Sequence, residues 1–536
     1  KEGASVGARQ ISFAAMAATP AIIAIFLPII FMQGIMGKFF FEFGVTISAA
    51  VAISLFEALV FTPMRCAQFL QVGQHQSRFG RLVDNTFRRL ASGYKKGLGF
   101  SLRHRRLVVI GAVVFFTASL GIFKVLNKEF VPPQDQSMIL CTLKTDPGSS
   151  IEFTSERFKE AEKVVAARPE VRNYFAAVGG FQGGESNRGI IFVSLKYPRE
   201  RPVAAPNKRP LSQKELMDIL RAELNKIPGL KAAMQDLSLS GFSAQRGFPI
   251  ELTVRGTSWD ELVVLTDNMQ DQMRKSGLMV DVNTDYLTGS KEIRIIPDRV
   301  KAAERGVSVE AIGEAINALI GGERVGKYTH NGRRYDIRVR LKPEQRAAPE
   351  DIADLYVWNN QGERVQLKDV ITIEQKDTSL NITRRSRERA ITIYANVAAG
   401  KSQSDAITEA QRVAKIVLPE GYDATLGGSS QAFKESNQSF VFVFVMGIVV
   451  AYMVLASQFN SYVHPLTILM ALPFSISGAL LALWATGQTV NIYSIIGIVL
   501  LMGIVKKNSI LLVEFTNQMR EQGKNAHEAI LEACPI

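Results

Sequence analysis

The distribution of apolar residues limits the fold of this chain more than any other feature of its sequence. The chain has 536 residues, and apolar runs of about twenty residues occur only before position 127 and after position 438. A helix of about that length can cross a bilayer. Between these runs lies a polar block without an apolar run of comparable length. We therefore predict a bundle of membrane helices that carries a large domain outside the bilayer.

Six membrane spans are predicted from these runs. They lie at about residues 11–32, 39–62, 107–126, 439–456, 467–485 and 493–515. Glu57 lies near the end of the second span, where it is compatible with either an interior-facing or an interfacial position.

The segment 65–106, between the second and third spans, fixes the predicted orientation. It carries ten Lys and Arg residues against a lone Asp84, and short loops of this kind stay in the cytoplasm. The polar block then lies outside the cytoplasm. Apolar residues recur at three- and four-residue steps over 79–94, which predicts an amphipathic helix on the membrane surface. A basic nucleic-acid patch is the alternative, but the position between two spans favours the membrane. The same topology accounts for part of the net charge of +13.

The polar block alternates between strand and helix patterns. Its first unit, residues 127–240, has the order strand–helix–strand–strand–helix–strand, which is the ferredoxin-like split unit. Ser212 and Glu215 form a capping-box pattern at the start of its second helix. A second unit of similar pattern comprises residues 241–289 and 377–430, and an insertion, residues 290–376, interrupts it.

Two lysines and an asparagine interrupt the last apolar run. Lys506, Lys507 and Asn508 lie near the middle of the predicted span, where an ammonium costs about 3 kcal/mol. Successive helix residues point about 100° apart, so the two lysines face different sides. A carboxylate partner is expected for a lysine at this depth. The alternative is a shorter span with Lys506 at its end.

A glycine-rich loop is the second candidate site. Residues 179–189 contain five glycines and join two predicted strands, and Phe175, Phe181 and Phe192 lie before, within and after the loop. Glycine lets a loop adopt several backbone states at low cost. The segment is compatible with a flexible hairpin whose aromatic residues belong to the core, or with an adaptable apolar wall for bulky ligands.

The sequence contains no pattern for catalysis, metal binding or nucleotide binding. The segment 321–328 nearly matches a phosphate loop, but Tyr328 replaces the magnesium-binding hydroxyl residue and the segment follows a predicted helix. We predict a glycine-rich turn entering a hairpin there. The five histidines and three cysteines lack metal-ligand spacing. We therefore predict no enzyme activity and no cofactor.

Four segments together resemble the resistance-nodulation-division transporters, in particular their hydrophobe/amphiphile efflux branch. KNSILLVEF at 507–515 resembles the lysine-bearing tenth helix of that branch, and 458–483 resembles its eighth-to-ninth helix passage. Residues 130–134, with the Pro147–Gly148 turn, resemble the start of its second periplasmic half. Residues 175–195 resemble the aromatic strand and flexible loop of its drug pocket.

The resemblance implies a partial chain of an α-helical transmembrane bundle with a large α+β periplasmic region. Residues 1–64, 107–126 and 437–519 would hold six membrane helices, residues 65–106 a cytoplasmic linker helix, and residues 520–536 a truncated cytoplasmic segment. The two units would be ferredoxin-like βαβ porter subdomains, and the insertion would be a docking subdomain. Such a protein lies in the bacterial inner membrane.

The resemblance also implies roles for individual residues. Lys507 and Asn508 would belong to a proton relay whose aspartate pair lies on a helix absent from this chain. The substrate pocket would include Phe175, Ala177, Phe181 and Phe192, and its flexible loop would include Gly179, Gly180, Gly183, Gly184 and Gly189.

The implied function is proton-driven multidrug export. Protons would be the coupling ion, amphiphilic small molecules the substrates, and the partners a homotrimer, a periplasmic adaptor (membrane fusion protein) and an outer-membrane channel. The alternatives are export of metal ions or lipids by another branch of the family, and a non-transporting membrane scaffold or receptor.

Overall fold

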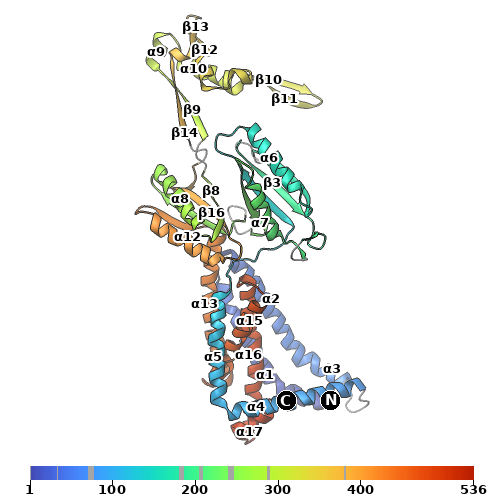
Figure 1. Ribbon diagram of the computed structural model, residues 1–536. Helices are drawn as coiled ribbons and strands as arrows, with labels where there is room; N and C mark the ends of the chain where they lie inside the picture. Colours follow the sequence, from blue (N-terminus) through green and yellow to red (C-terminus); the bar gives the residue numbers. More distant parts are fainter. Residues whose placement is uncertain are drawn as a thin grey trace.

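The computed structural model describes residues 2–32, 34–69, 78–179, 186–204, 209–239, 247–286, 290–378 and 382–535. Figure 1 shows a bundle of helices at one end, the two α/β units next to it, and the insertion at the far end. The polar block therefore lies on one side of the helix bundle, as the apolar runs predict.

Five helical stretches are long and apolar enough to cross a membrane. They are Phe40–Phe69, Arg105–Val125, Gly428–Phe459, His464–Ala485 and Ile492–Glu521. The first predicted span corresponds to a shorter apolar stretch, Ala15–Phe31, within the described residues. Five of the six predicted spans are thus present as full-length candidates. The helices of this region are α1 (Glu2–Phe26), α2 (Gly34–Phe56), α3 (Thr62–Phe69), α5 (Arg105–Val125), α13 (Gly428–Phe459), α14 (His464–Leu469), α15 (Leu472–Ala485) and α16 (Ile492–Glu521).

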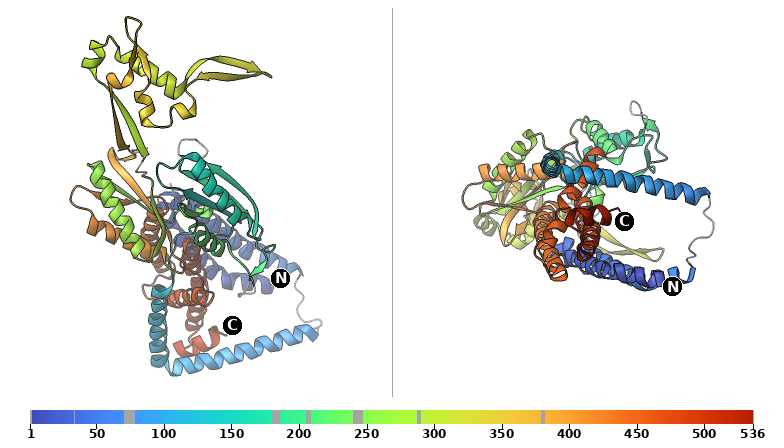
Figure 2. Two further views of the ribbon diagram at one scale, coloured as in Figure 1. Left: turned by 45° about the horizontal axis from the view of Figure 1, so that its top comes forward. Right: turned by 90° about the horizontal axis from the view of Figure 1, so that it is seen from below.

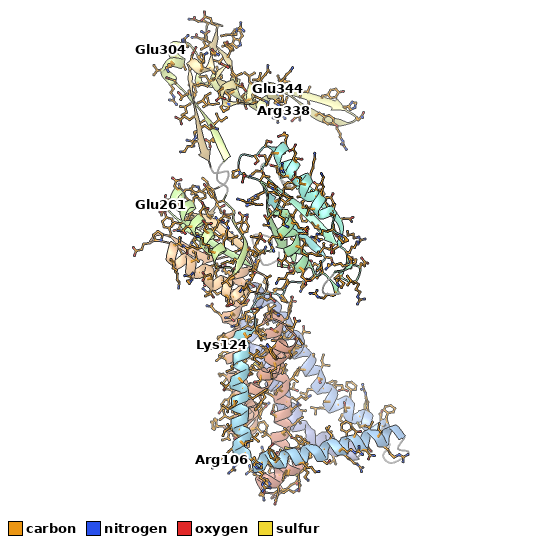
Figure 3. All side chains as sticks on the ribbon, viewed as in Figure 1. Arg106, Lys124, Glu261, Glu304, Arg338 and Glu344 are labelled. Carbon is orange, nitrogen blue, oxygen red and sulfur yellow. The ribbon has the colours of Figure 1, made fainter. Side chains whose placement is uncertain are left out.

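The bundle packs around α1, which contacts α2, α13 and α16. Its core includes Ile25 and Phe26 of α1, Val443 of α13 and Val499 of α16. Only 6% of the apolar stretch of α5 is buried, the same share as in Phe40–Phe69, which contains most of α2. Figure 3 labels Arg106 and Lys124 near the two ends of this helix. An apolar helix with charged ends and an exposed surface is typical of a lipid-facing span.

The basic linker forms α4 (Arg78–Arg103), which runs across the base of the bundle in Figure 1 and in both views of Figure 2. Leu82, Phe87 and Leu90 are more than 60% exposed although they are apolar. A long basic helix with uncovered apolar side chains fits the predicted position on a membrane surface. Its end near α5 contacts the last helix, α17 (Ala526–Ala533).

The first unit is a four-stranded antiparallel sheet covered by two helices. Its strand order is β2-β3-β1-β6. The elements are β1 (Met138–Lys144), α6 (Ile151–Ala166), β2 (Val171–Val178), β3 (Arg188–Leu195), α7 (Gln213–Leu224) and β6 (Lys231–Asp236), with the short strands β4 (Val203–Ala204) and β5 (Arg209–Pro210) before α7. Ser212 caps α7 in a complete capping box with Glu215. The core lies between the helices and one face of the sheet, where Ile139, Phe158 and Leu220 are buried.

The second unit repeats this arrangement. β16 lies between β7 and β8, and β17 pairs with the other edge of β7. The elements are β7 (Ile250–Gly256), α8 (Trp259–Lys275), β8 (Met279–Thr284), β15 (Arg384–Arg385), β16 (Glu388–Val397), α12 (Gln403–Val417) and β17 (Asp423–Leu426). Its core is separate from that of the first unit and includes Leu252, Met269 and Val413.

The insertion is attached through a two-stranded ribbon, β9 (Ser290–Pro297) paired with β14 (Ile371–Thr378). Its small core includes Ile312, Val357 and Leu367. Its remaining elements are α9 (Arg299–Glu304), α10 (Val309–Ile316), β10 (Glu323–His330), β11 (Arg333–Val339), α11 (Pro349–Ala353), β12 (Tyr356–Trp358) and β13 (Arg364–Gln366). The glycine pair at 321–322 ends a π-helical segment, Asn317–Gly322, where the sequence predicts a turn. The predicted hairpin, β10–β11, follows it directly, and the segment is not a phosphate loop.

The α/β units are joined to the membrane helices by hydrogen bonds of the segment that follows α5. The chain leaving α5 pairs with the loop before α16, where the Glu129 amide donates to the Val490 carbonyl at 3.1 Å. The Phe130 amide donates to Gln403 Oε1 of α12 at 2.8 Å. α13 has 32 residues, so it is about 48 Å long and connects the second unit directly with the membrane.

Candidate functional site

Two lysines occupy the middle of α16, a helix of 30 residues. Lys506 is fully buried, and Met502 and Ile510, one turn away on either side, are buried too. This stripe faces α1, because Gly503 lies against Ile22 and Ile510 packs in one cluster with alanines of α1. Within the described part of the chain, Lys506 Nζ has no hydrogen-bond partner. A buried cation without a partner is costly, which makes this position unusual.

Lys507 and Asn508 are exposed, so they face away from the described bundle. The two lysines therefore point to different sides, as helix periodicity predicts. No ion pair to Lys507 is formed among the residues described here. The predicted carboxylate partner of Lys507 and its role in a proton relay remain predictions.

The aromatic candidates lie on the sheet face opposite the helices of the first unit. The β2–β3 register places Phe175 directly opposite Phe192, and Ala177 opposite Ile190. Phe175 is 54% exposed. Neighbouring residues of β3 alternate between buried and half-buried, so Phe192 lies on the less covered face with Phe175. The structure thus brings together two of the predicted pocket aromatics, and neither belongs to the buried core of the sheet.

The glycine-rich loop is described only at its ends. Phe181, Gly180, Gly183 and Gly184 lie outside the described residues. Gly179 has φ +83°, a left-handed conformation that glycine adopts without strain. A Cβ at Gly189 would lie 2.4 Å from the Ala177 carbonyl oxygen and 2.4 Å from the Phe158 ring.

A polar cleft of about 590 Å³ lies between the two units. Thr142, Lys144 and Asn225 line it from the first unit, and Asp267, Arg274 and Asn283 line it from the second. Thr142 lies opposite Ile190 in the β1–β3 register, so the aromatic face and the cleft are parts of one sheet surface. The sequence did not predict this cleft, because its lining residues come from two units and share no local motif.

The described residues contain no group of three or more His, Cys, Asp or Glu side chains arranged to hold a metal ion. Cys141 is fully buried, and its burial raises the pKa of the thiol to about 12. The nucleophilic thiolate is therefore disfavoured at this position.

Comparison with known proteins decides the family. The model of the AcrB/AcrD/AcrF family matches residues 1–536, which is the whole chain. The chain belongs to this family. The resemblance to resistance-nodulation-division efflux transporters is confirmed by this match.

Multidrug resistance proteins are among the relatives of this family member. Multidrug resistance protein MdtC of Escherichia coli O81 (strain ED1a) is 30% identical over 549 residues, which cover 99% of this chain and 51% of that protein. MdtC of Cronobacter sakazakii (strain ATCC BAA-894) is 30% identical over 547 residues, with the same coverage. The chain therefore spans about half the length of the curated relatives it matches.

Proposed function

We propose that the protein exports drugs or other amphiphilic compounds across the bacterial inner membrane in exchange for protons. The observation that carries this proposal is the pair of lysines in the middle of α16, a helix long and apolar enough to cross a bilayer. Ionisable residues at this depth are rare and mark ion or substrate pathways. One charge that crosses 100 mV supplies about 2.3 kcal/mol, which is enough to shift a conformational equilibrium about fiftyfold.

Lys507 is the residue that we assign to proton coupling, with Asn508 beside it. Its exposure on α16 supports a partner contributed by another part of the protein, since the relatives are about twice as long as this chain. We propose that carboxylates from that part pair with Lys507 and release it when they are protonated. The released helix then shifts and changes the state of the α/β units.

The substrate path runs through the α/β units in this proposal. The exposed aromatic face with Phe175 and Phe192 provides apolar contact area, and the adjoining cleft provides polar groups. We propose that the pocket also contains Ala177, Phe181 and the glycine-rich loop. A homotrimer, a periplasmic adaptor and an outer-membrane channel complete the pump.

The test is Lys507→Met in the full-length protein, expressed in a bacterial strain that lacks its own drug efflux. We expect the inhibitory concentration of an amphiphilic cationic dye to fall to that of cells without the protein. Lys524→Met is the matched control, because Lys524 lies after the end of α16 and pairs with Glu532. Immunoblots of membranes establish equal amounts of the variants.

Proton coupling is measured separately in proteoliposomes with an imposed pH gradient. Addition of the dye should release protons with the wild type and with Lys524→Met but not with Lys507→Met. Full resistance together with full proton release in Lys507→Met would exclude the assigned role of this lysine. Dye export by the wild type without proton movement would exclude antiport.

A further inference from the structure

The contact between the two units contains a second cavity besides the cleft. This cavity, of about 100 Å³, is lined by Glu129 and Gln403 near the membrane junction and by Arg221 and Asn396 farther away. Asp281 lines the large cleft instead. The side chains of Arg221, Asn396 and Asp281 therefore stand between the two cavities.

These three side chains form one hydrogen-bonded network across the two units. Arg221 of α7 donates through Nε to both carboxylate oxygens of Asp281, at 2.9 and 2.8 Å. Asn396 of β16 donates to Asp281 at 2.7 Å and to the carbonyl oxygen of Met234 at 2.5 Å. Arg221 and Met234 belong to the first unit, whereas Asp281 and Asn396 belong to the second. Each donor thus bonds an acceptor of the opposite unit.

The network is largely shielded from water. The side chains of Arg221 and Asp281 are 17% and 4% exposed, and Asn396 is buried. Loss of Asp281 would leave the largely buried Arg221 paired within its own helix with the more exposed Asp218, and without a carboxylate from the opposite unit. Removing one partner of a buried ion pair is destabilising, because the other charge stays desolvated. The network therefore resists separation of the two units much more than an exposed ion pair would.

The backbone of the second unit is distorted where these groups are located. Asp281 has φ +54°, a left-handed conformation that is uncommon outside glycine but is tolerated by Asp. The β8–β16 ladder also shifts its register between Tyr394 and Asn396, opposite the segment that contains Asp281. Such β-bulges redirect side chains and recur next to functional sites. Two irregularities in one ladder thus coincide with Asp281 and Asn396, whose side chains bond the first unit.

We propose that Arg221, Asp281 and Asn396 form a latch that sets how far the cleft between the two units opens. The latch also closes the route between the cleft and the smaller cavity. Its three residues position the units and do not bind the solute. The proposal rests on the proposed function only in treating the cleft as part of the export path.

The test measures cleft opening without any transport. Thr142→Cys on the cleft wall is the reporter, in full-length protein whose partly exposed Cys66 and Cys534 are replaced by serine. Cys141 stays, since it is fully buried. The rate of maleimide labelling in membrane vesicles is compared with and without Asp281→Asn. We expect labelling to be about tenfold faster when the latch is broken, which corresponds to about 1.4 kcal/mol.

Glu223→Gln is the matched control, because Glu223 also lies on α7 but pairs with Arg168 inside the first unit. It should change labelling less than about twofold. Arg221→Lys keeps the charge but loses the contact with two oxygens, so an intermediate rate is expected. If Asp281→Asn does not reach the membrane, Arg221→Lys tests the latch in its place.

Equal labelling rates in the latch variants and in the Glu223→Gln control would contradict the proposed latch, whether or not the protein exports dye. Faster labelling in a protein that exports no dye would support the latch and reject the proposed function. If the wild type exports dye, the latch variants should export bulky dyes with an altered apparent KM, whereas the Glu223→Gln variant should not.

Discussion

Replacement of Arg201 by methionine should destabilise the first unit at its connection to the membrane. Arg201 is buried, and it donates to the two carboxylate oxygens of Asp135 at 2.5 and 2.6 Å. It also donates to the carbonyl oxygens of Lys196 and Leu211, both at 2.9 Å. Asp135 lies on the segment between α5 and β1, and it accepts a further bond from the amide of Gln213 in α7. The pair thus links the segment that follows α5 to the helices that cover the sheet of the first unit.

The expected loss of stability in Arg201→Met follows from the burial of Arg201 and the partial exposure of Asp135. Breaking a buried ion pair by removing one partner costs about 3–5 kcal/mol. The Asp135 side chain is 26% exposed, whereas that of Arg201 is fully buried. Water can therefore solvate part of the orphaned carboxylate, and the lower end of the range applies, about 3 kcal/mol. Opening of the unit should then become about a hundredfold more frequent, since 1.4 kcal/mol is a factor of about ten.

Amide hydrogen exchange in the full-length protein measures this opening. The slowest amides of β1 and β6 should exchange about a hundredfold faster in Arg201→Met than in the wild type. Arg209→Met is the control, because Arg209 also pairs with a carboxylate through two oxygens, yet it is exposed. The control should leave the exchange rates of β1 and β6 unchanged. Exchange in Arg201→Met within about twofold of the wild type would refute the reasoning.

The same pair predicts a pH dependence. Burial alone would raise the pKa of Asp135, but the hydrogen bonds from Arg201 and from backbone amides outweigh it and lower the pKa. The folded state therefore binds the proton more weakly than the unfolded state does. The stabilisation is complete above the ordinary carboxyl pKa of about 3.9, and it is lost as the pH falls through the lower folded value. Asp135→Asn should therefore resemble the wild type only in strong acid.

Three further predictions concern other positions. Gly189→Ala should destabilise the first unit by about 1–3 kcal/mol in hydrogen exchange, because its Cβ would clash with the Phe158 ring and a strand carbonyl; an unchanged exchange pattern would contradict this. Phe175→Ala should alter dye export without loss of folded protein, because the ring is exposed, whereas Phe158→Ala should cost about 3–5 kcal/mol of stability. Burial raises the pKa of Glu129 in the folded protein. Its carboxylate therefore destabilises the folded state progressively as the pH rises from the ordinary carboxyl pKa to the raised pKa. Glu129→Gln should therefore slow exchange of nearby amides at neutral pH, and the difference should vanish in acid.

Much of the architecture follows from local patterns. Apolar runs predict six membrane spans, because a bilayer requires about twenty apolar residues in sequence. Five of them are full-length candidates in the structure, and the first is the shorter apolar helix Ala15–Phe31. Capping residues and strand alternation predict the order of elements in the first unit. Helix periodicity predicts that Lys506 and Lys507 face different sides of α16. Each of these inferences depends only on neighbours in the chain.

The remaining features depend on which elements pack together. Periodicity cannot tell which lysine is buried, and the structure buries Lys506 because its side of α16 meets α1, where small residues such as Ala17 and Ala21 allow close approach.

The latch joins Arg221 to Asp281, 60 positions later, and Asp281 to Asn396, 115 positions later. Hydrogen bonds between residues so far apart in sequence leave no local pattern, because the fold of the two units alone brings them together. The sequence by itself therefore determined the long apolar helices, the order of elements in the first unit and the position of the lysines in the middle of α16. The tertiary structure decided the buried lysine, the cleft and its latch, since burial and contact are properties of packing.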